Sequence, residues 1–313
     1  MHMRRSWSPL FTLLVLAVGG CDPPAEVGEP AGIDAAEHDI TARASCTKIR
    51  VRKSWRLMTS AERAAFLGAV KQLQARPGGQ LSIYDGLVKK WGAAVWTFDG
   101  YPQFLPWTRK WLRNVELELQ KIDPNVTIPY WDWDHDAGSP HLAAVWGTGA
   151  FGGNGKAGDC VVDGKFAGYQ VKVPQAQAGC LRRDWDLEPA LSGFDSIEAV
   201  TSYVVGGGGY DEFLNHAIGS TFVTPFVAIG GHMNTKSGAP NDPLGLLVLA
   251  QTDRLWHSWQ ARGGWSNYAK YAGTNKDGTP AALADSIVNY GVSVSSVLDI
   301  TAHCYAYDTR VGG

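Results

Sequence analysis

The sequence predicts a mainly helical single domain with long irregular loops and few short strands. Apolar residues recur at helical spacing in several separate stretches, capping residues and Pro-Gly pairs bound those stretches, and strand-like alternation is rare. The 313 residues, 45% of them apolar, are enough to bury a large core. The 13 Trp, 11 Tyr and 10 Phe exclude a disordered or low-complexity chain.

The first half of the domain predicts three helices in order. Thr59 and Glu62 form a capping box ahead of apolar residues at helical spacing, and Pro77-Gly78-Gly79 ends that helix. A second helical stretch runs from about 82 to 96. A third follows Pro106 and ends at Asp123-Pro124.

The second half is less regular. Gly-rich, irregular sequence fills residues 137–195 and predicts loops. Two further helices are expected near 211–229 and 243–261, the latter with Asp242 as N-cap and Pro243 at its first position. No internal repeat is found in the sequence.

Residues 1–20 predict a secretory signal. Arg4 and Arg5 precede an apolar run that is too short to span a bilayer. The run ends in Val18-Gly19-Gly20-Cys21, which resembles a bacterial lipobox with Cys21 as the acylated residue. The alternative is an ordinary signal peptide with a chance Cys. Because several acyl chains anchor stably, we expect an exported lipoprotein anchored in a membrane of the bacterial cell envelope.

Residues 21–45 predict a flexible acidic tether, and residues 46–313 form the domain. The tether is rich in Pro, Ala and Gly, and six acidic residues there face the single Arg43. The whole chain carries 28 Lys and Arg against 30 Asp and Glu. Nucleic-acid binding needs a basic surface, so we expect a small molecule or a protein as partner and no nucleic acid.

Four of the five cysteines remain once Cys21 is set aside. An even number in an exported protein indicates two disulfides, and four cysteines allow three pairings. The simplest pairing joins Cys160 to Cys180 across a Gly-rich loop and Cys46 to Cys304 across the domain ends. No cysteine spacing is typical of a zinc site.

A series of motifs resembles one known family. They are RKSWRLMTSAER at 52–63, PQFLPWTRKWL at 102–112, PYWDW at 129–133, CVVDGKFAGY at 160–169, GCLRRDW at 179–185, GGHM at 230–233, NDP at 241–243, DRLWHSWQ at 253–260 and YAY at 305–307. In this order they resemble the tyrosinases, the type-3 copper proteins that include catechol oxidases and hemocyanins. The resemblance implies an antiparallel four-helix bundle, with Tyr305 and Tyr307 stacked near Arg52.

The resemblance also implies where two copper ions would be held by six His. Those positions carry other residues here: Trp91, Asp99, Thr108, Phe222, Phe226 and Leu249. The Asn that orients a base in the family falls at Val223. Independently of the family, no two His residues of the domain are four apart, the spacing that lets a helix present two ligands on one face. We therefore expect no copper cofactor.

Asp99 is the one candidate for metal-free chemistry. A lone carboxylate facing the vacated site is a possible general base. The structural alternative is that Asp99 bonds to Thr108 or pairs with Arg109 or Lys110.

Two other groups of polar residues favour structural roles. The alternating Asp132, Asp134 and Asp136 lack the Gly and Glu that a calcium loop needs. His257 follows Asp253 by four residues on the last predicted helix, which favours an ordinary helix pair.

Three functions remain open from the sequence. The first is a non-copper pseudoenzyme or binding protein on a tyrosinase fold. The second is a metal-independent enzyme that uses Asp99 in the old pocket. The third is an authentic phenol or catechol oxidoreductase. Fold alone does not carry function, and the substituted ligand positions favour the first. The volumes of the new side chains predict a filled site without a cavity for a phenol.

Overall fold

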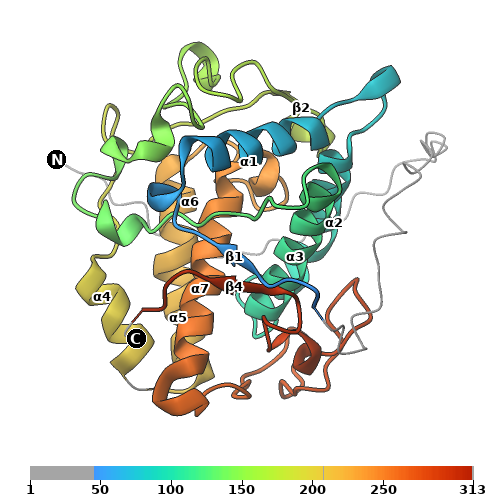
Figure 1. Ribbon diagram of the computed structural model, residues 1–313, viewed down its shortest axis with the longest axis vertical. Coiled ribbons are helices and arrows are strands. Elements are labelled where there is room, and N and C mark those ends of the chain that lie inside the picture. Colours follow the sequence, from blue (N-terminus) through green and yellow to red (C-terminus); the bar gives the residue numbers. More distant parts are fainter. Residues whose placement is uncertain (1–45, 207, 312–313) are drawn as a thin grey trace, which may run out of the picture.

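Helices from four stretches of chain form the bundle at the core (Figure 1). In the computed structural model, which describes residues 46–206 and 208–311, these are α2 (Ile83–Phe98), α3 (Phe104–Ile122), α7 (Leu244–Trp265) and a composite helix. The composite helix runs through α5 (Tyr210–His216), the π-helix η10 (Ala217–Val223) and α6 (Thr224–Ile229). The predicted mainly α fold with a bundle core is confirmed.

Two shorter helices lie outside the bundle. Helix α1 (Ser60–Leu73) packs against α3 and α2, and it begins at the predicted capping box of Thr59 and Glu62. Helix α4 (Ile197–Thr201) continues into the π-helix η9 (Ser202–Gly206) and was not predicted. Single 3-10 turns connect the helices at Trp55–Leu57, Pro77–Gly79, Trp133–His135, Pro140–Leu142, Ala144–Trp146, Ala157–Asp159, Gln175–Gln177, Ala239–Asn241 and Val294–Val297.

Prolines explain where the helix boundaries differ from the prediction. Helix α3 begins at Phe104, ahead of Pro106, because a first turn tolerates a residue without an N–H. Helix α7 begins one residue after Pro243, and the Asp242 carboxylate accepts a hydrogen bond from the Leu244 N–H at 3.1 Å. Pro225 lies at the junction of η10 and α6, where its missing N–H interrupts the helical ladder.

The strands are few and short, as predicted. Strand β1 (Arg50–Arg52) pairs in parallel with β4 (Tyr305–Tyr307), and β2 (Gln170–Val171) pairs antiparallel with β3 (Gly179–Cys180). The Cys46–Cys304 disulfide joins the starts of the first pair, and Cys160–Cys180 ties the second pair to its loop. Both predicted disulfides are confirmed.

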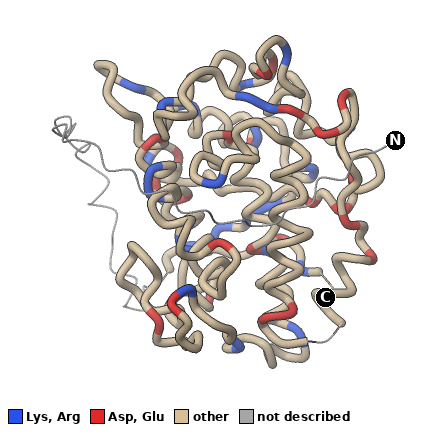
Figure 2. The backbone as a smooth tube through the Cα atoms, turned by 180° about the vertical axis from the view of Figure 1, so that it is seen from behind, with Lys and Arg blue, Asp and Glu red and all other residues tan. Residues whose placement is uncertain are grey.

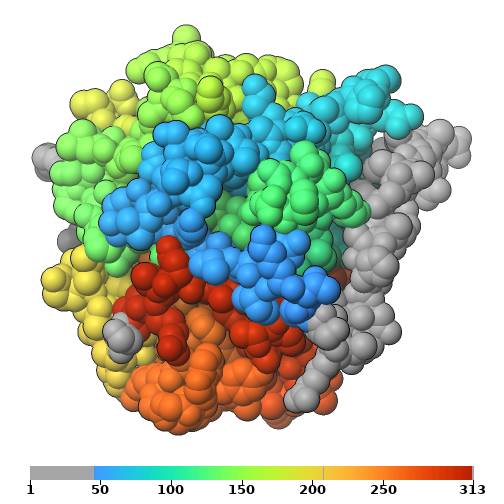
Figure 3. Space-filling view, viewed as in Figure 1, coloured from blue at the N-terminus to red at the C-terminus, as the bar shows by residue number. Residues whose placement is uncertain are grey.

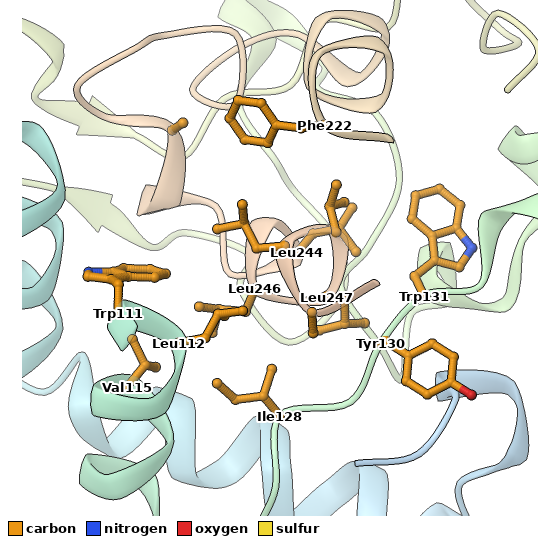
Figure 4. Close-up of a cluster of buried hydrophobic side chains, with 14 of the residues drawn as sticks. Trp111, Leu112, Val115, Ile128, Tyr130, Trp131, Phe222, Leu244, Leu246 and Leu247 are labelled. Atoms are coloured by element: carbon orange, nitrogen blue, oxygen red, sulfur yellow. The ribbon is translucent and has the colours of Figure 1, made fainter. Parts of the chain in front are cut away.

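Apolar side chains from distant segments meet beside α7. Figure 4 shows Leu244, Leu246 and Leu247 between α3 and the segment that carries Ile128 and Tyr130. Charged residues of both signs are distributed over the backbone (Figure 2). Within residues 46–206 and 208–311, no helix is long and apolar enough to cross a membrane. The predicted signal, Cys21 and tether lie outside these residues.

Candidate functional site

The bundle brings the sequence-predicted positions into one region. Trp91 lies on α2, Thr108 on α3, Phe222 on η10, Phe226 on α6 and Leu249 on α7, and all five side chains are buried. The ring centroid of Phe222 lies 6.3 Å from that of Trp91 and 4.4 Å from that of Phe226. The rings from α2 and the composite helix therefore pack against each other.

Trp91 is the centre of an aromatic cluster. Its indole lies 5.3 Å from the rings of Phe98 and Trp111 and 5.6 Å from that of Trp107. Its Nε1 donates a hydrogen bond to the Lys236 carbonyl at 2.9 Å. Buried aromatic rings at such separations stabilise each other, and a bonded indole N–H leaves no unpaired polar atom. The inner part of the site is filled, as the sequence predicts.

Thr108 is held by its own helix. Its hydroxyl donates to the carbonyls of Phe104 at 2.8 Å and Leu105 at 3.0 Å. This back-bonding is the usual solution for a Thr inside a helix. The ring centroid of Phe104 lies 4.9 Å from that of Phe222, so the turn that holds Thr108 also contributes to the aromatic packing.

Asp99 caps the end of α2 and forms an ion pair with Lys236, whose Nζ lies 2.6 Å from Oδ2. The expectation that Asp99 bonds to Thr108 or pairs with Arg109 or Lys110 was wrong, because its partner is Lys236. Arg109 is taken by Asp253 at 2.5 Å. The loop that carries Lys236 follows the GGHM motif. No periodic pattern in the sequence predicts that this loop packs against the end of α2.

A pocket of about 460 Å³ opens over Phe222 and Phe226. The rest of its apolar lining comes from Val95, Trp96, Val223, Val227, Met233 and Ala239, and its polar lining from Asp99, Asn234 and Lys236. Trp96 is 56% exposed at the rim, and the Lys236 ammonium lies 4.8 Å from its ring. The expectation of a site without a cavity was wrong, because the large side chains fill the inner region and leave a hollow outside it.

The histidines of the domain are dispersed. His232 is buried, its Nδ1 accepts from the Arg182 N–H at 2.9 Å, and its Nε2 bonds to the Gln177 carbonyl at 3.0 Å. Burial lowers the pKa of His232, so the ring stays neutral. Among residues 46–206 and 208–311, no three His, Cys, Asp or Glu side chains lie close enough to share a metal ion.

The Asp132–Asp136 segment has structural partners. Asp132 accepts from Ser54 at 2.6 Å and pairs with Arg56 at 2.7 Å. Asp136 accepts from the Trp131 indole at 2.8 Å. These contacts agree with the expectation of a structural segment rather than a calcium loop.

A buried ion network surrounds Asp253 of α7. The Arg52 guanidinium is 3.8 Å from the Tyr305 ring centroid and pairs with Glu116 at 3.0 Å and Asp253 at 3.2 Å. The hydroxyls of Tyr305 and Tyr307 donate to Asp253 at 2.8 and 2.7 Å. The Asp253 charge acts on His257 four residues along α7, as the spacing predicts, but the main partners of the carboxylate are the Arg and Tyr side chains. The network joins β1, α3, α7 and β4.

The comparisons with known proteins agree with this architecture. The common central domain of tyrosinase matches residues 87–262. The chain is 32% identical to the tyrosinase of Streptomyces antibioticus over 279 residues, which cover 78% of this chain and 99% of the relative. It is also 32% identical to grixazone synthase of Streptomyces griseus over 267 residues, which cover 68% of this chain and 85% of that protein.

Solved structures show the same fold. A single-residue variant of the polyphenol oxidase of Thermothelomyces thermophila superposes with a TM-score of 0.70 at 19% identity, over 88% of this chain and 94% of the other. A functional unit of octopus hemocyanin superposes with a TM-score of 0.59 at 16% identity, over 83% and 68% of the two chains. From the matched domain and the extent of the shared sequence, we conclude that the chain belongs to the tyrosinase family.

Proposed function

We propose that this chain is a tyrosinase-family protein that works without copper and binds an apolar, ring-sized ligand in the pocket over Phe222 and Phe226. The proposal rests on the side chains at the six positions that the resemblance assigns to the copper-binding His of the family. Indole, phenyl and isobutyl groups do not coordinate metal ions, and one carboxylate with one hydroxyl is a weak set for copper.

The two side chains of that set that carry oxygen, Asp99 and Thr108, already have partners within the protein. Asp99 pairs with Lys236, and the Thr108 hydroxyl donates to two carbonyls of its own helix. Trp91 and Phe222 pack their rings with centroids 6.3 Å apart and offer no metal ligand. The residues present do not fit a dinuclear copper centre, and this misfit supports a binding role over oxidation.

The pocket supports the ligand class. Its volume of about 460 Å³ falls in the range of small-molecule sites, which are mostly apolar with a few polar groups. Trp96, Phe222 and Phe226 offer aromatic surface, and Asn234 and Lys236 offer hydrogen-bond donors. A ring with one acceptor group satisfies both parts of this lining.

Copper content tests the central part of the proposal. The protein is expressed and purified with copper, and the Streptomyces antibioticus tyrosinase is prepared alongside as the loading control. We expect well under one copper per chain by elemental analysis and no oxidation of tyrosine or catechol. About two coppers per chain, with an oxygen-bound absorption band and turnover of either phenol, would overturn the proposal.

Ligand binding tests the pocket. With phenol as probe, we expect ligand-observed NMR to detect binding to the wild type. Val227 is 45% exposed in the pocket and Val162 is 58% exposed outside it. We expect Val227→Asp to weaken phenol binding at least fivefold and Val162→Asp to leave it unchanged. Equal effects of the two variants, or no binding by the wild type, would contradict this assignment.

The ion pair of Asp99 gives that residue a structural role in our proposal. Because Lys236 belongs to the loop that borders the pocket, the pair holds this loop against the end of α2. The metal-independent enzyme would instead need Asp99 as its acid or base. Conversion of a phenolic or related ring compound by the copper-free protein, lost in Asp99→Asn, would favour that alternative.

The location of the protein is a separate part of the proposal. Acylation at Cys21 would hold the domain at a membrane of the cell envelope through the tether of residues 22–45. We expect the wild type in the membrane fraction, and Cys21→Ser to release it or block its processing. A soluble wild-type protein whose mature chain begins at another residue would refute the anchor.

A further inference from the structure

The end of α7 holds a second, unrelated hollow. A pocket of about 450 Å³ is lined by His257, Trp265, Tyr268, Leu298, Asp299, Ile300 and Thr301. It lies where the end of α7 meets the C-terminal segment, and those two parts of the chain are neighbours in the space-filling view (Figure 3). Nothing in the proposed phenol site involves these residues.

The walls of this hollow are aromatic rings set at large angles. The Trp265 ring lies 6.1 Å from Tyr268 at 78° and 5.4 Å from His257 at 57°. Buried Leu298 and Ile300 supply apolar surface. All three rings line the same hollow, and rings set at large angles around one hollow suit an alkylated ammonium group.

The backbone holds Trp265 in an unusual conformation. Its φ is 71°, in the left-handed region, directly after Gly263 and Gly264, whose φ values are 58° and 68°. A bulky residue there is strained, and such strain gathers at functional sites. The indole is nevertheless 44% exposed, so burial of this large ring in the core does not account for the strained turn.

The charges of the hollow suit a cation. Asp299 lines it, and burial would raise the pKa of this carboxyl, but hydrogen bonds from the Thr301 hydroxyl and N–H outweigh burial and lower it. Burial and the Arg109 charge lower the pKa of His257 to about 4, so its ring is neutral near pH 7. The Arg310 guanidinium, 5.7 Å from the Trp265 centroid, already uses this indole as a cation partner.

From this geometry we propose that the hollow formed by Trp265, Tyr268, His257 and Asp299 binds a quaternary ammonium group. The rings contact the methyl groups and the positive charge, and Asp299 supplies the counter-charge. The ligand carries this group on a small soluble molecule such as choline or on a choline lipid headgroup. The two sources share the chemistry that the cage recognises.

Binding of choline chloride to the purified protein, measured by calorimetry and proton NMR, tests the proposal. We expect saturable binding and an upfield shift of the N-methyl resonance, because the methyl groups lie over ring faces. The neutral isostere 3,3-dimethylbutanol should bind at least tenfold more weakly. Phosphatidylcholine vesicles that bind the protein in competition with choline assign the group to a lipid, and vesicles that fail to compete assign it to a free molecule.

Matched variants locate the site. Trp265→Ala and Asp299→Asn should each weaken choline binding at least fivefold, whereas Arg310→Gln should strengthen it by removing a competing cation. Trp96→Ala removes a comparably exposed Trp from the phenol pocket and should leave choline binding unchanged. No saturable choline binding, equal binding of the neutral isostere, or equal loss in Trp96→Ala would overturn the proposal, and none of these results bears on phenol binding.

Discussion

Removing one charge from the buried network should cost more stability than removing one from a surface pair. Asp253 is fully buried, and burial would raise its pKa, but the Arg109 and Arg52 charges and the Tyr307 hydroxyl lower it. Removing one partner of a buried pair leaves the other charge uncompensated. Asp253→Asn should therefore lower the free energy of unfolding by about 3–5 kcal/mol in urea titration.

The exposed pair of Lys53 and Glu62 is the matched control. Both side chains are more than a third exposed, and exposed pairs contribute at most about 1 kcal/mol. Lys53→Gln should change the unfolding free energy by about 0.5 kcal/mol or less. Similar losses in Lys53→Gln and Asp253→Asn would show that the buried network has no special weight.

His303 makes stability depend on pH. Burial and the Arg109 charge lower its pKa to about 4, against 6.5 for an ordinary His. The unfolded state then binds the proton more readily, so its contribution is present above pH 6.5 and lost as pH falls toward 4. At about 1.4 kcal/mol per pKa unit, the loss is at most about 3.5 kcal/mol. His303→Gln should flatten the unfolding free energy over this pH range, and an unchanged slope would contradict the assignment.

At the scale of elements, substitution by Ala should have opposite effects at two glycines in helix interiors. A Cβ on Gly92 in α2 would lie 2.9 Å from the Ser237 carbonyl oxygen, whereas a Cβ on Gly68 in α1 meets nothing within 4 Å. Gly68→Ala should raise the unfolding free energy by about 0.4–1 kcal/mol by its helix propensity. Gly92→Ala should lose that gain and weaken phenol binding, because Ser237 and its neighbour Lys236 must move away from α2.

Thermal unfolding and the phenol assay together check this pair of variants. If Gly92→Ala stabilises the protein as Gly68→Ala does and binds phenol normally, the loop at 232–238 does not depend on close approach to α2. The prediction links the shape of the pocket to one backbone contact.

The helices differ in how well the sequence predicts them. The capping box at Thr59 placed the start of α1, because this signal is local. The helical stretch expected from about 82 agrees with α2, but the capping box of Ser82 and Asp85 that begins it was not recognised in the sequence. The π-helical segment before Pro225 was not foreseen, since the residues around it keep an ordinary helical pattern. The partner of Asp99 was missed for a different reason: Lys236 reaches it across the fold, and nothing near either residue in the sequence records the contact.

At the scale of the molecule, the two disulfides close loops of very different length. Cys46 and Cys304 are 258 residues apart, and Cys160 and Cys180 are 20 apart. In the chain-entropy account, a longer loop restricts the unfolded state more. Cys46→Ala with Cys304→Ala should lower the unfolding free energy by about 2–5 kcal/mol, and Cys160→Ala with Cys180→Ala by less. A larger loss in the second double variant, measured by urea titration, would show that local strain outweighs loop length.

The Cys46–Cys304 bond has a mechanical consequence. Since β1 and β4 run parallel and the bond joins their starts, residues 46–304 form one covalently closed loop. Tension applied to the chain on either side of this loop passes through two sulfur atoms and β4, and the helices carry none of it. Under oxidising conditions the domain should extend under force only by the length of its outer segments, while a reducing agent should expose the whole helical core to the load.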